Sequence, residues 1–67
     1  MELTINGELY ENLAEILTVS DLLAYLKLPK GKIAVERNLE IVSKSAFDTT
    51  QLETNDKLEI IHFIGGG

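Results

Sequence analysis

The residues best suited to chemistry lie at the very end of the chain, in the segment Ile64-Gly65-Gly66-Gly67. Glycine has no Cβ, so this segment can adopt backbone conformations closed to other residues and can pass through a channel too narrow for side chains. Four extended residues reach roughly 13 Å, far enough to place the Gly67 carboxylate in another protein's active site. We predict that residues 65–67 are a flexible tail in which Gly65 and Gly66 thread into a partner, carried by a domain of residues 1–64.

Two plainer explanations of these glycines stay open at this point. Terminal glycines are often simply disordered, and they can be left behind by cloning. The sequence argues against both, because no linker separates the last apolar stretch from the glycines.

A terminal carboxylate resists nucleophiles until another protein activates it. Transfer of AMP from ATP converts it into a mixed anhydride with a good leaving group, and glycine leaves the acyl carbon accessible. The attacking group is then a thiol, an amine, or a persulfide that leaves sulfur behind. The chain has no cysteine, so any sulfur it carries must sit on Gly67. The residues alone leave the nucleophile, and therefore the pathway, open.

The rest of the sequence offers little for catalysis or metal binding. There is no cysteine, one histidine (His62), and no spacing that indicates a catalytic triad, a pair of carboxylates or a metal-ligand cluster. We interpret His62 as a structural residue in the middle of a strand. We predict that the chain is not an enzyme and that its domain binds neither a metal nor a cofactor.

The charge of the 67-residue chain is unevenly distributed. All of the net charge of −5 comes from residues 1–26, which contain acidic residues but no lysine or arginine. Nucleic acid is therefore not an expected partner, because binding it depends on basic residues that neutralise phosphates. Such an acidic face attracts a partner with a basic surface, or it serves only solubility. No apolar run is long enough for a membrane span and no signal segment opens the chain, so we expect a cytoplasmic protein with no membrane partner.

The first half of the chain predicts two strands and a helix. Residues 1–6 alternate apolar and polar, Asn6-Gly7 is a strong hairpin signal, and residues 8–13 form the returning edge strand. Thr18 and Asp21 have the spacing of a helix N-cap with an acidic third position. The helix presents Val19, Leu22, Leu23 and Leu26 on one face, and Pro29 ends it soon after Leu28.

The second half predicts three more strands. They cover residues 32–37, 40–42 and 57–63, with turns at Asn38-Leu39 and Asn55-Asp56. Residues 43–55 are polar and irregular, with Phe47 and Leu52 as the expected anchors in the core.

One helix can cover only one face of such a sheet. We expect it to pack on the side of Leu3, Ile5, Ile33, Val35, Leu58 and Ile60, with the first and last strands as central, parallel neighbours. Ile61, Phe63 and Ile64 are then left on the surface at the root of the tail, and we predict that they dock a partner. The alternative is that residues 43–55 cover them.

The order of elements resembles that of the ubiquitin-like β-grasp fold, an α+β fold with a mixed five-stranded sheet and one main helix on one face. Four segments look like the sulfur carrier proteins of thiamin biosynthesis, and together with the element order they extend the match over essentially the whole chain. The segments are Asn6-Gly7-Glu8, Thr18-Val19-Ser20-Asp21-Leu22-Leu23, Ile33-Ala34-Val35-Glu36-Arg37-Asn38 and Leu58-Glu59-Ile60-Ile61-His62-Phe63-Ile64-Gly65-Gly66-Gly67.

This resemblance implies a route for sulfur. A partner of the ubiquitin-activating type, using ATP and magnesium in its own site, would adenylate Gly67. A persulfide supplied through a cysteine desulfurase would then convert the terminus to a thiocarboxylate, and thiazole synthase would take the sulfur. Asn55-Asp56 stands where the family commonly has Gly-Asp, and Ser43-Lys44 where it has proline and a basic residue.

Four other functions remain compatible with the sequence. A carrier for molybdopterin synthesis uses the same terminal chemistry, although such chains are longer and often have proline close to the last glycines. A sulfur carrier for amino acids or tRNA, a ubiquitin-like modifier attached to lysines, and an interaction domain with inert glycines are the others.

Overall fold

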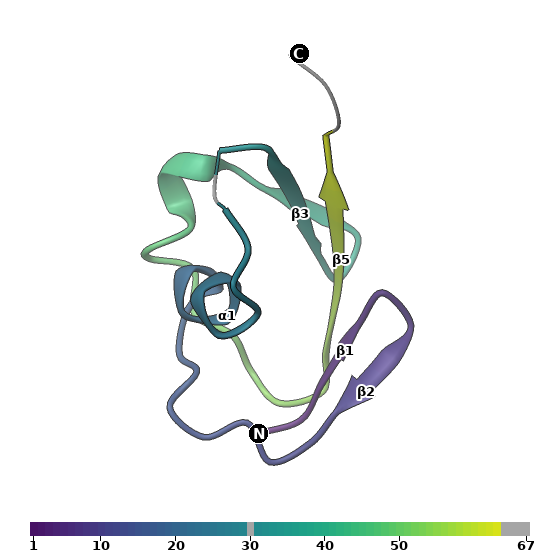
Figure 1. The fold of residues 1–67 in the computed structure, drawn as a ribbon. Helices are drawn as coiled ribbons and strands as arrows, with labels where there is room; N and C mark the ends of the chain where they lie inside the picture. The colour runs from purple at the N-terminus through teal and green to yellow at the C-terminus, as the bar shows by residue number, and fades with distance from the viewer. Residues whose placement is uncertain (30, 64–67) are drawn as a thin grey trace.

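Five short strands pair into one mixed sheet, and a single α-helix lies against one face of it (Figure 1). The computed structural model describes residues 1–29 and 31–63. The strands are β1 (Leu3–Ile5), β2 (Glu8–Tyr10), β3 (Ile33–Arg37), β4 (Glu40–Val42) and β5 (Asp56–His62), in the spatial order β2-β1-β5-β3-β4. β1 and β5 are parallel, and the other pairs are antiparallel. The predicted sheet, with the last strand central beside the first, is confirmed.

The core lies between this sheet and the helix α1 (Val19–Tyr25). All six sheet residues predicted to face the helix are buried, and so are three of the four predicted helix positions; the fourth, Leu26, is half-buried. Phe47 and Leu52 are also buried, as predicted. No helix within the described residues has the length and apolar character needed to cross a membrane.

Both predicted hairpin turns form at residues with positive φ. Asn6 (φ 51°) and Gly7 (φ 82°) connect β1 to β2, and Asn38 (φ 51°) and Leu39 (φ 72°) connect β3 to β4. Two consecutive residues with positive φ match the right-handed twist of the flanking strands. Leu39 is unusual here, because a bulky side chain in the left-handed region is strained, and the side chain is 90% exposed.

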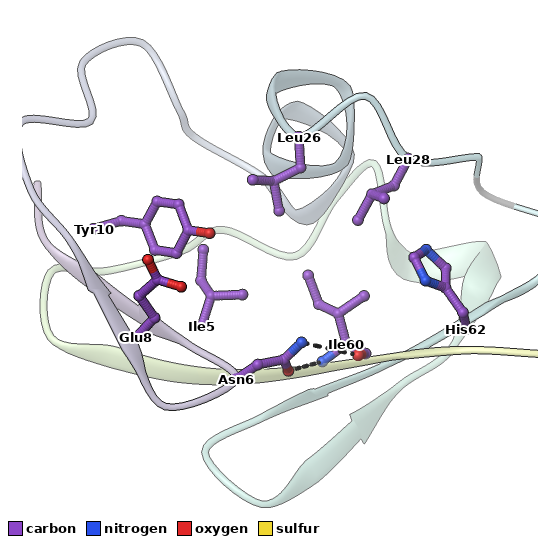
Figure 2. A pocket seen from close by; sticks show the side chains of 8 residues that line it. All are labelled: Ile5, Asn6, Glu8, Tyr10, Leu26, Leu28, Ile60 and His62. Carbon is purple, nitrogen blue, oxygen red and sulfur yellow. Dashed lines mark hydrogen bonds between the residues drawn. The ribbon is translucent and has the colours of Figure 1, made fainter.

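Asn6 has a second role that its turn signal did not predict. Its side chain accepts a hydrogen bond from the Ile60 N–H (2.7 Å) and donates one to the Ile60 carbonyl (3.2 Å), as Figure 2 shows. Its own backbone N–H donates to the Leu58 carbonyl (2.9 Å). The ladder between β1 and β5 ends at Ile5 and Leu58, so the Asn6 amide continues the pairing of β5 beyond the end of β1.

The helix begins as predicted, at a capping box formed by Thr18 and Asp21. The Thr18 hydroxyl accepts from the Asp21 N–H (3.1 Å), while the Asp21 carboxylate accepts from the N–H groups of Thr18 (3.0 Å) and Leu17 (2.9 Å). The N–H groups of Val19 and Ser20, which have no acceptor inside the helix, donate to carbonyls of Thr50 and Phe47. The segment 43–55 therefore packs against the start of α1.

The helix ends earlier than predicted, at Tyr25 and not after Leu28. Lys27 adopts a positive φ of 60°, and the Leu28 N–H turns back to donate to the Leu23 carbonyl (2.9 Å). This backbone geometry stops a helix before a following proline can act. Pro29 is not the cause of the ending.

Three other features also differ from the prediction. The second strand stops at Tyr10 and not at Leu13, because Asn12 has a positive φ of 60° that removes the chain from the sheet; Leu13 is still buried. The region predicted as irregular contains a 3-10 helix, η1 (Lys44–Ala46). The last strand covers Asp56–His62, one residue earlier than predicted at each end.

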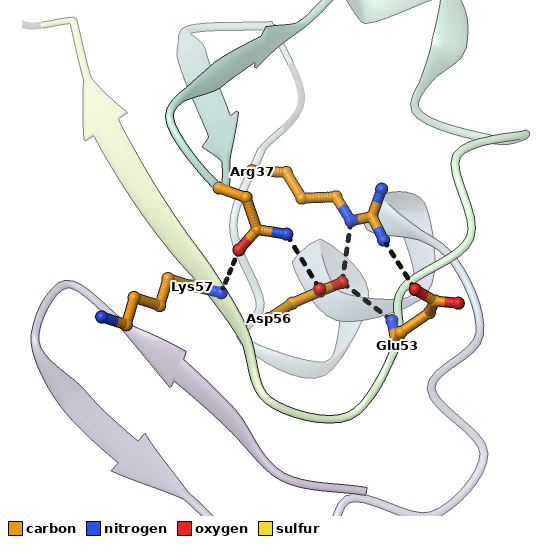
Figure 3. A network of polar contacts seen from close by, with 5 residues as sticks. Arg37, Glu53, Asp56 and Lys57 are labelled. Carbon is orange, nitrogen blue, oxygen red and sulfur yellow. Dashed lines mark hydrogen bonds and ion pairs between the residues drawn. The ribbon is translucent and has the colours of Figure 1, made fainter.

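Asp56, at the start of β5, is a buried acid that sequence reasoning placed only in a turn. It is 6% exposed, and its carboxylate accepts hydrogen bonds from Arg37 Nε (2.7 Å), Asn38 Nδ2 (3.0 Å) and the Glu53 N–H (2.8 Å) (Figure 3). Asn38 in turn accepts from the Lys57 N–H (2.9 Å). These contacts connect the β3–β4 turn to the start of β5.

Burial by itself raises the pKa of the Asp56 carboxyl. The hydrogen bonds from Glu53, Asn38 and Arg37 outweigh that effect, so the pKa lies below its ordinary value. The backbone hydrogen bonds from Leu17 and Thr18 likewise lower the pKa of Asp21. Both carboxylates are thus better stabilised in the folded than in the unfolded chain.

Replacing Leu39 with glycine is expected to stabilise the fold. An L-residue in the left-handed region carries a steric cost of roughly 1–2 kcal/mol, which glycine avoids, and the exposed leucine contributes little packing. We expect Leu39→Gly to raise the free energy of unfolding in urea by about 1 kcal/mol. Gly7→Leu is the matched control in the other hairpin: a Cβ added at Gly7 meets no atom within 4 Å, so its expected destabilisation reports backbone strain alone. A stability loss in Leu39→Gly contradicts the argument.

Stability is expected to fall in acid because of Asp56. A folded-state pKa below the unfolded value gives stabilisation that is complete above the unfolded pKa, about 4, and is lost as the pH falls through the folded pKa. Urea unfolding between pH 7 and pH 2 measures this loss. Asp56→Asn should cost roughly 1.5–3 kcal/mol at pH 7 and flatten the acid limb, and adding Asp21→Asn should flatten it further. An acid limb of unchanged slope in Asp56→Asn is incompatible with this role.

Candidate functional site: the C-terminal end of β5

The predicted site lies at and beyond the end of β5. Ile64, Gly65, Gly66 and Gly67 fall outside the described residues, so the tail and the domain boundary at residue 64 stay predictions. Ile61 and Phe63 are described. The structure therefore shows the part of the domain from which the tail starts.

The end of β5 is supported on both edges. On one edge β3 pairs with it as far as Ile33 and His62, and the Phe63 N–H donates to the Lys32 carbonyl (2.9 Å). On the other edge the Asn6 side chain holds Ile60. The strand thus extends past the end of β1 without losing its hydrogen bonds at Ile60, and this gives the root of the tail a defined direction.

Ile61 and Phe63 are exposed, as predicted. Ile61 is 48% exposed and Phe63 is 53% exposed. The alternative that residues 43–55 cover them is wrong, because the apolar side chains of that segment, Phe47 and Leu52, belong to the core on the helix side. Ile61 points to the face of the sheet away from α1, which we call the open face.

Ile41 also belongs to the open face, and sequence reasoning missed it. Ile41 pairs with Glu36 of β3, and Ile61 pairs with Ala34 of β3. Ala34 and Glu36 are two positions apart in one strand, so Ile41 and Ile61 lie on the same face of the sheet. Ile41 is 77% exposed. Two adjacent apolar residues in β4, Ile41 and Val42, were the available signal, because neighbours in a strand face opposite sides. Val42 packs against the core, so Ile41 must lie outside.

The other face of the same strand end borders a cavity of about 290 Å³. Figure 2 shows it between the end of α1 and the β1–β2 hairpin. The described residues that line it are Ile5, Asn6, Glu8, Tyr10, Leu26, Leu28, Ile60 and His62. Sequence reasoning did not find this cavity, because its residues come from three separate segments of the chain.

His62 differs from its predicted placement. It is the last residue of β5 and not a mid-strand residue, it is exposed, and its imidazole makes no hydrogen bond to a described residue. The Ser20 hydroxyl donates to Asp48, but the His62 imidazole is hydrogen-bonded to neither of them. In residues 1–29 and 31–63, therefore, no serine, histidine and acid form a triad. Within the same residues no group of His, Asp or Glu is placed to hold a metal ion.

Comparison with known proteins gives a consistent relationship. The model of the ThiS family matches residues 2–67. The sulfur carrier protein ThiS of Bacillus subtilis is 38% identical over 65 residues, covering 97% of this chain and 98% of that protein. The crystal structure of the thiamine biosynthesis protein (ThiS) from Geobacter metallireducens covers both chains fully, with a TM-score of 0.83 and 36% identity.

Two relatives are much longer. A thiazole synthase of Paramagnetospirillum magneticum is 51% identical over all 67 residues, and one of Magnetococcus marinus is 39% identical over the same length. The chain spans about a fifth of the length of these two proteins.

The sheet order, the single helix and the match over the full length agree with one another. The fold is the ubiquitin-like β-grasp, and the chain belongs to the ThiS family.

Proposed function

We propose that this chain is a sulfur carrier in thiamin biosynthesis and that its reactive group is the carboxylate of Gly67. The observation that carries the proposal is the extent of the family match, which runs through residue 67 and so includes the terminal glycines. The Bacillus subtilis relative, which has nearly the same length, is itself named a sulfur carrier. The described residues offer exposed apolar surface at the end of β5, which suits binding to a partner.

The chemistry proceeds on a partner enzyme. The Gly67 carboxylate attacks the α-phosphorus of ATP, pyrophosphate leaves, and an acyl adenylate forms in the magnesium-dependent site of an adenylating enzyme of the ubiquitin-activating type. A persulfide sulfur, supplied through a cysteine desulfurase, attacks the acyl carbon and displaces AMP. Cleavage of the resulting acyl disulfide by a thiol leaves the thiocarboxylate. The chain is a co-substrate in these steps and not the catalyst.

Thiazole synthase is the proposed acceptor of the sulfur. The two relatives named thiazole synthase contain a segment that matches this entire chain, which supports a direct functional association between the two. The carrier must be bound so that its terminus enters the synthase site.

The domain contributes the binding. Ile61 presents apolar surface on the open face, and Phe63 is exposed just after the end of β5. Together with Ile64 they are the proposed docking surface for a partner. Gly65 and Gly66 extend from this docking surface as a narrow thread. Asn6 and β3 hold β5 in place up to the end of the strand. A partner that binds Ile61 and Phe63 therefore also fixes the direction in which the terminus points.

Intact-mass spectrometry tests the reactive group. Incubation of the chain with the adenylating enzyme, ATP, magnesium and a persulfide donor is expected to add the mass difference between sulfur and oxygen, and fragmentation should place it on Gly67. A reaction without ATP is the control. Finding only unmodified protein in the complete reaction rules out the carrier function, and finding the chain joined to lysines supports a modifier instead.

Removing Gly66 and Gly67 is expected to abolish thiazole formation without unfolding the domain. Among the described residues, the buried core lies between Leu3 and Ile60, so the truncated chain should keep its thermal unfolding midpoint. The readout is growth of a carrier-deficient strain without added thiamin or thiazole. Growth supported by the truncated chain at the level of the full chain shows that the terminus is not the site.

A further inference from the structure

The cavity beside His62 has the lining of a binding site for one long, positively charged side chain. Its floor and roof are aliphatic, formed by Ile5, Ile60, Leu26 and Leu28. Figure 2 shows Glu8 and Tyr10, both from β2, at one end, and Leu28 and His62 at the other end. An apolar passage thus leads to a carboxylate and an aromatic face.

The polar groups at the acidic end, Glu8 and Tyr10, have no partner among residues 1–29 and 31–63. Neither the Glu8 carboxylate nor the Tyr10 hydroxyl is hydrogen-bonded to a described residue, and Glu8 forms no ion pair with one. By contrast, the Asn6 amide in the same lining is fully engaged with Ile60. Two unengaged polar groups at the end of an apolar cavity are available to a ligand.

The size of the cavity limits the ligand. Small-molecule and cofactor sites measure roughly 300–1,000 Å³, so about 290 Å³ lies at the lower limit of that range. A single side chain of an approaching protein suits this volume better than a nucleotide or another large cofactor.

The chemistry selects lysine or arginine. These side chains place an aliphatic stem along apolar surface and keep the charged group at its end. A carboxylate stabilises that group by a charge-assisted hydrogen bond, and an aromatic ring stabilises it by a cation–π contact. The described residues of the lining include no lysine or arginine, and the segment of residues 1–26 that supplies Glu8 and Tyr10 has none in its sequence.

We propose that this cavity is a second docking site, in which thiazole synthase inserts a lysine or arginine side chain next to Glu8 and Tyr10. The proposal rests on the proposed function, because it takes the synthase as the partner. The site lies on the face of β5 opposite Ile61, at the same end of the strand. A partner that engages both faces holds the root of the tail from two sides.

Binding of the full chain to thiazole synthase from the same genome tests the proposal. Glu8→Gln should raise the Kd roughly fivefold, and Glu8→Lys should raise it at least about tenfold. Glu40→Lys is the matched control: Glu40 is an exposed strand residue with the same change of charge, but it lies on β4 at the opposite edge of the sheet. We expect its Kd to change by less than about twofold.

A probe of the basic group itself gives an independent readout. In nuclear magnetic resonance titrations, N-acetyl-arginine amide should shift the amide signals of Tyr10, Leu26, Leu28 and His62, and Glu8→Gln should weaken these shifts. N-acetyl-norleucine amide has the aliphatic stem without the charge and should shift the same signals much less.

The outcomes separate this proposal from the proposed function. If Glu8→Lys binds the synthase as the unsubstituted chain does, or weakens binding no more than Glu40→Lys, the cavity is not a docking site for a basic side chain. Absence of synthase binding by the unsubstituted chain also overturns the proposal. Formation of the Gly67 thiocarboxylate, followed by mass, should be unchanged in Glu8→Gln, and its complete absence in every variant defeats the carrier function instead.

Discussion

The rest of the structure depends on the pairing of β5 with β1 on one edge and β3 on the other. β5 is the last element of the chain and the central strand of the sheet, so the two ends of the sequence must meet before the sheet exists. Its buried side chains, Leu58 and Ile60, complete the core under α1. This central strand therefore contains the last core residue of the described chain, Ile60, three residues before Phe63.

Two polar clusters keep this strand in register. The Asp56 network connects its start to the β3–β4 turn, and the Asn6 amide holds Ile60 near its end. A slip of one residue would turn Leu58 and Ile60 to the open face and bring Ile61 into the core. It would also turn Asp56 to the open face and so separate its carboxylate from its donors Arg37 and Asn38. The burial of the apolar side chains of β5 and the hydrogen bonds of Asp56 and Asn6 thus favour the same register of the strand.

The end of β5 presents different chemistry on its two faces. Ile61 offers apolar surface on the open face, while the helix-side cavity combines aliphatic walls with Glu8 and Tyr10. A carrier needs to be recognised and released by successive partners, and a small domain has limited surface for this. In the proposed function, a partner would find apolar contact on one face of this strand end and charge complementarity on the other.

The sequence by itself determined the features that depend on neighbouring residues. The turns at Asn6-Gly7 and Asn38-Leu39, the Thr18–Asp21 cap and the buried faces of α1 and β5 follow from local backbone preference and from periodicity. Tertiary structure alone decided the burial of Asp56, the second role of Asn6, the exposure of His62 and the cavity. Each of these features depends on residues that are far apart in the chain; Asn6 and Ile60, for example, are 54 positions apart. Local sequence patterns contain no information about which distant groups will come into contact.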